Sequence, residues 1–144
     1  MISTKGRYAL RLMIDIALNQ NDGYVTLKDA SAREDISVKY LEQVASLLTK
    51  ANLLVSYRGN NGGYRLSRET KDYKIGEILR VAEGSLAPVA CLQCDNNICK
   101  RKEICTTLEF WKGFNNVINN YVDGITLENL VDQARSNLID NYTI

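Results

Sequence analysis

Hydrophobic residues in the first fifty positions recur every three or four residues, the spacing of helices that bury one face. The pattern predicts a helix over residues 3–20, capped by Ser3 or Thr4. Thr26 starts a second predicted helix over about 27–33, and Ser37 caps a third over about 37–52. A short helix, a tight turn and a longer helix form a helix-turn-helix, whose second helix can enter the major groove of DNA. A helical hairpin with a solvated polar face has the same pattern.

Alternation of apolar and polar residues then predicts two short strands, over residues 53–57 and 64–66. The connection at 58–63 contains three glycines and two asparagines, which permit positive φ angles and a protruding turn. A phosphate-cradling loop is the competing interpretation, but no helix follows at once and no Gly-Lys-Ser/Thr is present. A basic, glycine-rich hairpin directly after a helix-turn-helix indicates a winged helix.

The second half of the chain predicts three further helices and a polar loop. An amphipathic stretch covers residues 73–84, and a longer helical pattern runs over about 103–121, with Cys105 in its first turn. Thr126 caps a last helix, and from Asn137 we expect a polar, frayed tail.

These elements predict a mainly α fold with a small β-hairpin wing. We divide the chain into a winged helix-turn-helix DNA-binding domain at 1–84, a cysteine loop at 85–105, and a region at 103–144 with a dimerisation helix and a C-terminal helix. The apolar face of helix 103–121 suits a second copy of itself, because the winged unit already has enough helices for its own core. Symmetric DNA readers dimerise to match their half-sites, so we expect a homodimer on a palindromic or pseudo-palindromic operator.

The exposed start of helix 37–52 carries side chains that can reach base edges or phosphates. These are Ser37, Val38, Lys39, Glu42 and Gln43. Arg58 stands at the base of the predicted wing, where it can reach a phosphate or the narrow minor groove. Lys5 and Arg7 are further candidates, although the first helix also fits a purely structural role.

The distribution of charge agrees with a polyanionic partner for the N-terminal part. Residues 1–80 hold 13 Lys and Arg against 9 Asp and Glu, whereas residues 81–144 hold 5 against 8. The chain has no histidine, so the usual general base of enzymes is missing. We therefore expect that the protein is not an enzyme. No apolar run is long enough to span a bilayer and the N-terminus lacks a signal-peptide pattern, which indicates a cytoplasmic protein without a membrane partner.

All four cysteines of the chain lie within one short polar stretch, as Cys91, Cys94, Cys99 and Cys105. In a cytosolic protein such a cluster is more often metal-binding or redox-active than disulfide-bonded. Four soft sulfur ligands suit a thiophilic metal or an iron–sulfur cluster. The Cys-x2-Cys-x4-Cys-x5-Cys spacing also suits a structural zinc clip, and Cys94 with a neighbour could form a metal-free thiol pair.

Several motifs together resemble one family, the bacterial winged-helix regulators that include IscR, NsrR and CymR. The resemblance covers nearly the whole chain and is carried by Ser3-Thr-Lys-Gly-Arg-Tyr8, Ser37-x-x-Tyr40-Leu-Glu-Gln43, Arg58-Gly59-x-x-Gly62-Gly63-Tyr64, Ile75-Gly-Glu-Ile78 and Cys105-x5-Trp111. It implies a dimeric transcription factor whose helix 37–52, with Tyr40, enters the major groove. It also implies that Arg58 and Gly59 approach the minor groove.

The same resemblance implies a [2Fe–2S] cluster held by three cysteines and one further ligand. Cys91, Cys99 and Cys105 correspond to the three cysteines. Cys94 is the leading candidate for the fourth ligand, ahead of an exogenous thiol or a residue from the other subunit. IscR has a histidine where this chain has Leu108, which cannot ligate. NsrR takes a carboxylate from the first helix of the partner subunit, and the matching Gly6-Arg7-Tyr8 contains no acid.

The resemblance therefore predicts a repressor whose DNA binding is modulated by the cluster and reports iron–sulfur, redox or nitric oxide status. The alternative is the same DNA-binding regulator with zinc or no metal, in which a zinc clip or a thiol switch controls cysteine or sulfur metabolism.

Overall fold

The first three helices begin where hydroxyl side chains can accept hydrogen bonds from free backbone N–H groups. A computed structural model describes residues 1–142, and in it the predicted cap residues take these positions. Ser3 accepts from Lys5 N at the start of α1 (Thr4–Asn19), Thr26 from Asp29 N at α2 (Leu27–Glu34), and Ser37 from Tyr40 N at α3 (Val38–Lys50). The helix-turn-helix is confirmed.

A two-stranded antiparallel hairpin follows α3 and forms the predicted wing. Strand β1 (Leu54–Tyr57) pairs with β2 (Gly63–Leu66). Gly59, Asn61 and Gly63 have positive φ angles, which explains the glycine and asparagine content of the turn. A Cβ atom on Gly63 would also collide with the backbone carbonyl of Val25, so only glycine fits there.

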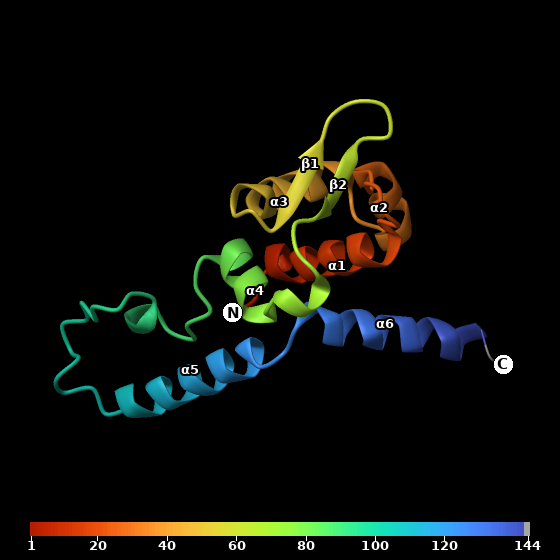
Figure 1. Ribbon diagram of the computed structural model, residues 1–144. Helices are drawn as coiled ribbons and strands as arrows, with labels where there is room; N and C mark the ends of the chain where they lie inside the picture. The colour runs from red at the N-terminus through yellow and green to blue at the C-terminus, as the bar shows by residue number, and fades with distance from the viewer. Residues whose placement is uncertain (143–144) are drawn as a thin grey trace.

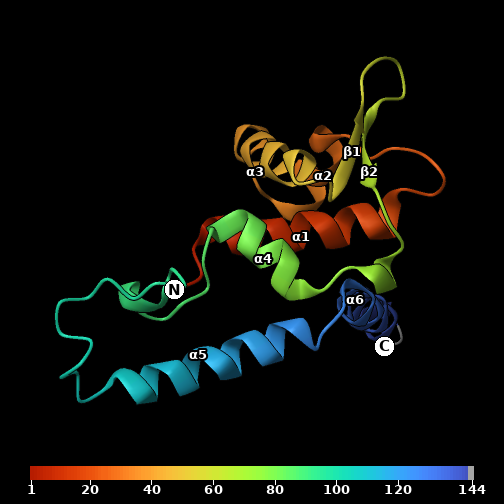
Figure 2. The ribbon, with the colours of Figure 1, turned by 60° about the vertical axis from the view of Figure 1, so that its left-hand side comes forward.

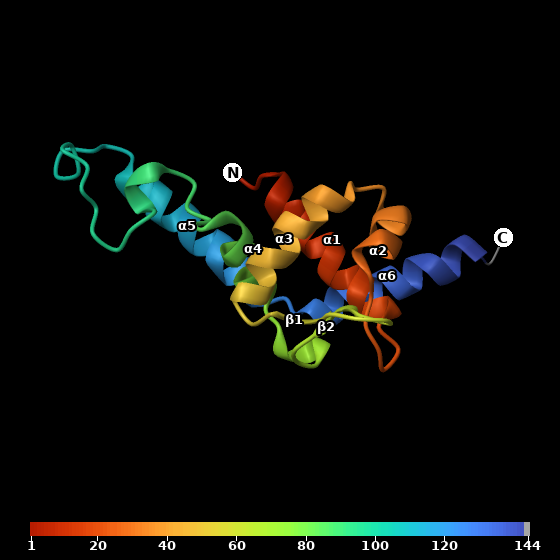
Figure 3. The same cartoon turned by 90° about the horizontal axis from the view of Figure 1, so that it is seen from above.

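The remaining elements are short 3-10 turns and three helices. They are η1 (Thr70–Asp72), α4 (Ile75–Glu83), η2 (Ala90–Leu92), α5 (Leu108–Asp123) and α6 (Leu127–Tyr142). In Figures 1 and 2, α2, α3 and the hairpin lie on one side of α1, and α5 and α6 lie on the other. Figure 3 shows α3 crossing α1. Within residues 1–142, no helix has both the length and the apolar character needed to cross a bilayer.

One hydrophobic core joins the winged unit to the C-terminal helix. Leu12, Leu41 and Ile78 from α1, α3 and α4 are fully buried, and so are Leu127 and Val131 from α6. The α6 helix therefore packs against the first helix instead of standing apart from the N-terminal unit. The mainly α fold with a hairpin wing is confirmed.

The predicted start of the helix over about 103–121 is wrong. The helix begins at Leu108, not near Glu103, so Cys105 lies in the preceding loop and not in the first turn. Two consecutive β-branched residues, Thr106 and Thr107, are weak helix formers because their hydroxyls compete for backbone hydrogen bonds. Residues 99–104 form isolated turns instead, with a 3.0 Å hydrogen bond from Ile104 N to Arg101 O.

The expected polar tail from Asn137 is also helical as far as Tyr142. Side-chain pairs one turn apart support this extension, as between Gln133 Nε2 and Asn137 Oδ1 at 3.2 Å. Thr143 and Ile144, the last residues of the predicted region 103–144, lie outside the described residues.

Candidate nucleic-acid interface and cysteine loop

The exposed side of α3 carries the side chains predicted to read DNA. Leu41, Val44 and Leu48 are buried on the opposite side, against α1 and the rest of the core. The predicted reading residues all face outward, namely Ser37, Val38, Lys39, Glu42 and Gln43. The α3 helix itself lies on the side of α1 that also carries the wing (Figures 1 and 2).

Tyr40 lies differently from its neighbours on α3. It is half-buried, and its ring packs edge-on against Tyr8 of α1, with ring centroids 5.1 Å apart and an angle of 80° between the planes. The guanidinium of Arg11 lies over the Tyr8 ring at 5.6 Å. Tyr40 thus fixes α3 on α1, and a direct contact with DNA stays a prediction for this residue.

The structure brings Lys5 of α1 close to Gln43 of α3. Both line a shallow hollow of about 300 Å³, together with Val44, Ser46 and Leu47. Arg7, two residues further along α1, is exposed as well. Lys5 therefore adds a cation beside the reading side of α3, as phosphate contacts require, and a DNA contact of Arg7 stays a prediction.

Arg58 and Gly59 occupy the start of the wing turn and are both exposed. Among the described residues, Arg58 forms no ion pair, so its charge is free for a ligand. Gly59 has a φ angle of +125°, which residues with a side chain rarely adopt. The turn thus holds a cation at its base and has little side-chain bulk, as insertion into a minor groove needs.

Glu83, the last residue of α4, holds the start of α1 and was not identified from the sequence. Its Oε1 accepts hydrogen bonds from Ser3 N at 2.8 Å and Gly6 N at 2.9 Å, and the Ser3 hydroxyl donates to the same carboxylate. Partial burial raises the pKa of the Glu83 carboxyl, but the hydrogen bonds from Ser3 and Gly6 outweigh it, so the pKa lies below its ordinary value. The end of α4 and the beginning of α1 are therefore tied together.

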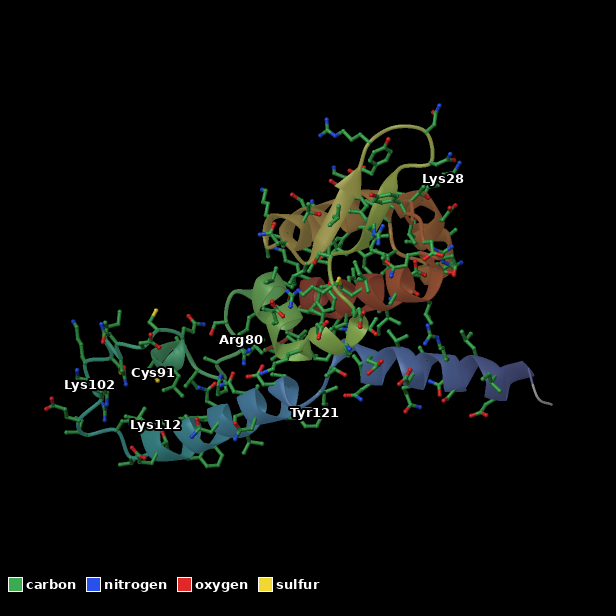
Figure 4. The ribbon with its side chains drawn as sticks, viewed as in Figure 1. Lys28, Arg80, Cys91, Lys102, Lys112 and Tyr121 are labelled. Carbon is green, nitrogen blue, oxygen red and sulfur yellow. The ribbon has the colours of Figure 1, made fainter. Side chains whose placement is uncertain are left out.

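The cysteine loop leaves α4 at Gly84 and returns at the start of α5 (Figure 4). Cys91, Cys94 and Cys99 line one hollow of about 420 Å³, together with Ala90 and Ile98 among others. Cys91 is half-buried in η2, and Cys94 and Cys99 are exposed. Three of the four predicted metal ligands thus share one concave surface, which Cys105 does not line.

Cys105 lies three residues before the first residue of α5, Leu108, close to backbone N–H groups that are free at a helix start. Hydrogen bonds from the backbone and the hydroxyl of Thr107 lower the pKa of the Cys105 thiol from its ordinary value, and Leu108 N and the charge of Arg101 act in the same direction. The Cys105 Sγ atom lies 3.6 Å from Thr107 Oγ1. This environment favours the thiolate, the form that binds metals.

The donor set of the loop fits a thiophilic group, whereas its conformation does not assemble a coordination sphere. Thiolates are the usual ligands of zinc and of iron–sulfur clusters. Within residues 1–142, no group of three or more Cys, Asp or Glu side chains lies close enough to hold one metal ion. The four thiols are therefore suitable donors for a metal group, but the conformation of the loop does not bring them together.

The α5 helix has no buried residue and carries an unpartnered apolar stripe. Phe110, Phe114, Val117 and Tyr121 are between 45% and 69% exposed. Figure 4 shows Tyr121 on the side of α5 that faces away from the wing. Trp111 and Ile118 are half-buried and line an apolar hollow with Leu86 and Pro88, and Phe114 of the stripe lines the same hollow. The spacing of three and four residues is that of the apolar face predicted for helix 103–121.

Arg80 clamps the C-terminal end of α5 onto α4. Its guanidinium donates to both carboxylate oxygens of Asp123, at 2.8 and 2.9 Å, and to Asn119 Oδ1 at 2.6 Å. The hydrogen bond from Arg80 lowers the pKa of the Asp123 carboxyl. The position of α5 against the winged unit is therefore fixed by a bidentate ion pair.

A helix-turn-helix with an outward-facing second helix, followed by a cationic hairpin, defines this protein as a winged helix-turn-helix DNA-binding regulator. The family model Rrf2, described as an iron-dependent transcriptional regulator, matches residues 2–133. The chain belongs to this family, whose members are transcriptional regulators and not enzymes.

Relatives and solved structures agree with this assignment. The regulator IscR of Aliivibrio salmonicida is 35% identical over 144 residues, which cover 99% of this chain and 84% of that protein. The structure of CymR, the global cysteine regulator of B. subtilis, has a TM-score of 0.74 and 37% identity, and covers 92% of this chain and 97% of that one. For IscR of T. potens the values are 0.72 and 35%, with coverage of 93% and 88%. The resemblance to IscR and CymR is confirmed.

Proposed function

We propose that this regulator is a homodimeric repressor whose operator binding is controlled by a [2Fe–2S] cluster on the cysteine loop. The observation that carries the proposal is the concentration of all four cysteines in the loop between α4 and α5. The family description, iron-dependent, and the relatives named IscR support the same conclusion. The protein would report iron–sulfur, redox or nitric oxide status, and it would act in the cytoplasm, where the operator DNA is.

The proposed dimer uses α5, because its apolar stripe covers nothing within the described part of the chain. A stripe of Phe110, Phe114, Val117 and Tyr121 repeats every three to four residues, which is the spacing that two packed helices bury. A twofold dimer would place two α3 helices for a palindromic or pseudo-palindromic operator. In this proposal residues 1–84 bind DNA, 85–105 form the cysteine loop and 103–144 hold the dimerisation and C-terminal helices.

Cys91, Cys99 and Cys105 are the proposed cluster ligands, with Cys94 as the fourth. Cys91, Cys94 and Cys99 already share one hollow, and the surroundings of Cys105 favour its thiolate. When bound, the cluster would link the cysteines of the loop to one another, and this link is sensitive to redox state and to nitric oxide.

Two contacts would connect the loop to the DNA-contacting residues. The Glu83 carboxylate ties the end of α4, one residue before the loop leaves at Gly84, to the start of α1 near Lys5. The Arg80–Asp123 ion pair ties α4 to the proposed dimer helix. A change in the loop would therefore shift the balance between arrangements of the two winged units.

The test is anaerobic purification, followed by visible absorption spectroscopy and analysis of iron and sulfide. We expect a brown protein with about two iron and two sulfide per chain, as the cluster type requires. Ser replacement of Cys91, Cys99 or Cys105 should abolish the colour, and Cys94→Ser tests the fourth ligand. Equal binding of apo and holo protein to DNA fragments selected from a random library would contradict the regulatory part of the proposal.

CymR, the global cysteine regulator among the solved relatives, favours a second candidate function. In it, the same DNA-binding regulator carries a zinc clip or a metal-free thiol switch and controls cysteine or sulfur metabolism. Zinc leaves the anaerobic protein colourless with one metal per chain, and a thiol switch gives a peroxide-induced disulfide in mass spectrometry. The same anaerobic preparation therefore distinguishes a [2Fe–2S] cluster, a zinc clip and a metal-free thiol switch.

A further inference from the structure

The outer side of the wing carries side chains that the DNA-binding residues described above do not include. In the hairpin register Leu54 pairs with Leu66 on the core side. Because side chains alternate along a strand, Val55, opposite Arg65, and Tyr57 lie on the outer side. Val55 is 43% and Tyr57 is 55% exposed, and Arg65 is exposed as well.

The connection between α1 and α2 adds a third strand-like segment to the hairpin. Val25 N donates to Tyr64 O, and Tyr64 N donates to Val25 O, both at 2.8 Å (Figure 2). Val25 is buried on the core side, so its neighbour Tyr24 comes out on the outer side, beside Arg65. The wing is therefore wider at its stem than the two strands alone.

Three of these side chains form an ordered cluster, the outer wing cluster, made of Tyr24, Tyr57 and Arg65. The Tyr24 and Tyr57 rings stack with centroids 5.3 Å apart and an angle of 28°. Gly63, opposite Tyr57 on β2, has no side chain, so nothing separates the two rings. The Arg65 guanidinium lies over the Tyr24 ring at 5.8 Å, within the range of a cation–π contact.

Arg65 contacts the Tyr24 ring but has no carboxylate partner. Among residues 1–142 it forms no ion pair. A guanidinium that stacks on a ring keeps its N–H donors at the edge of the plane, in the fork that matches two phosphate oxygens. The cluster therefore offers a held, uncompensated cation to an anion.

We propose that the outer wing cluster binds a backbone phosphate of the same DNA duplex that α3 and the wing turn contact. This inference rests on the DNA-binding function, and it extends the interface from the turn to the stem of the wing. Tyr57 precedes Arg58 directly, so a duplex that receives Arg58 in a groove brings its flanking backbone to the stem. The phenol hydroxyls of Tyr24 and Tyr57 are further donors suited to phosphate oxygens.

The test is the salt dependence of DNA binding by the full chain, measured by fluorescence anisotropy. Two duplexes serve as probes, one selected by the wild-type protein from a random library and one scrambled sequence of the same composition. Arg65→Gln should weaken binding to both by a similar factor. It should also reduce the slope of log affinity against log salt by about 0.9 for each phosphate that the variant no longer neutralises.

Two further variants separate charge from position. Tyr24→Leu keeps the charge of Arg65 but removes the ring that holds it, so affinity should fall while the salt slope stays near that of wild type. Arg135→Gln removes an exposed arginine of α6 and serves as the matched control, because α6 and the wing lie on opposite sides of α1 (Figure 1). It should bind both duplexes as wild type does.

If Arg65→Gln binds DNA with the affinity and the salt slope of the wild-type protein, the inference is overturned and the DNA-binding function still stands. The outer wing cluster would then face a protein partner. A loss confined to the selected duplex, with an unchanged slope, would also overturn it, because a base contact would be responsible. Absence of binding to any selected duplex by the wild-type protein would instead refute the DNA-binding function itself.

Discussion

The phenol of Tyr73 should contribute more to stability than any other hydroxyl group at the base of the wing. Tyr73 is fully buried, and its hydroxyl donates to Leu53 O at 2.7 Å. The same oxygen accepts from Ser67 N at 2.9 Å and Arg68 N at 3.1 Å. One side chain between η1 and α4 thus joins the residue before β1 to the residues after β2.

Tyr73→Phe removes this group and keeps the ring. The buried carbonyl of Leu53 would lose its partner, which costs about 1–3 kcal/mol. Ser67 N and Arg68 N are partly open to water, so removing each hydrogen bond costs about 0.5–1.5 kcal/mol. Since neighbouring contributions do not add fully, we expect a loss of about 2–4 kcal/mol in the free energy of unfolding. For a chain of this length the fall in Tm is on the order of 10 °C.

Thermal and urea unfolding followed by circular dichroism measure this loss. Tyr40→Phe is the matched control, because the Tyr40 hydroxyl makes no hydrogen bond with another described residue and its ring contact with Tyr8 survives. It should change stability by less than about 0.5 kcal/mol. If Tyr73→Phe unfolds within about 1 kcal/mol of Tyr40→Phe, water replaces the phenol without cost and the proposed anchor of the wing is refuted.

Two further predictions concern DNA reading and assembly. Arg58→Ala should weaken binding to all duplexes alike and flatten its salt dependence, whereas Gln43→Ala should change the preference at one base pair by about 1–3 kcal/mol. Fluorescence anisotropy with duplexes that carry single base-pair substitutions measures the affinity and the base preference. If Arg58→Ala binds DNA with unchanged affinity, the assignment of the hairpin as a DNA-binding wing is wrong. Phe114→Glu places a charge in the apolar stripe of α5 and should give a monomer in sedimentation velocity. Asn116→Glu, on the other side of the same helix, should stay dimeric, and a dimeric Phe114→Glu would exclude α5 as the interface.

Local signals in the sequence were enough for the winged unit. The caps Ser3, Thr26 and Ser37 determine their helix starts through contacts within three residues, and the turn at 58–63 needs its glycines for backbone angles. Such short-range effects can be recognised in one sequence. The exposed side of α3 followed from the same periodicity.

Contacts between distant residues could not be predicted in this way. Glu83 looks like an ordinary solvated acid at the end of an amphipathic helix, and nothing near it points to Ser3. The stacking of Tyr24 on Tyr57 depends on the bridge between Val25 and Tyr64, which joins segments far apart in the chain. The predicted start of α5 near Glu103 is wrong because local hydrogen bonding at Thr106 and Thr107 competes with the helix, which periodicity does not reveal.

The contact between Glu83 and the start of α1 also restricts which residues can replace its partners in related chains. A Cβ atom on Gly6 would lie 2.5 Å from Glu83 Oε1 and 3.1 Å from Ile2 Cγ2, so even alanine would push the carboxylate away from Ser3. The restriction is mutual, because without Glu83 the N–H groups of Ser3 and Gly6 lose the acceptor that they share. Positions 6 and 83 are therefore expected to vary together, and a relative with a larger residue at position 6 should carry a shorter side chain at position 83.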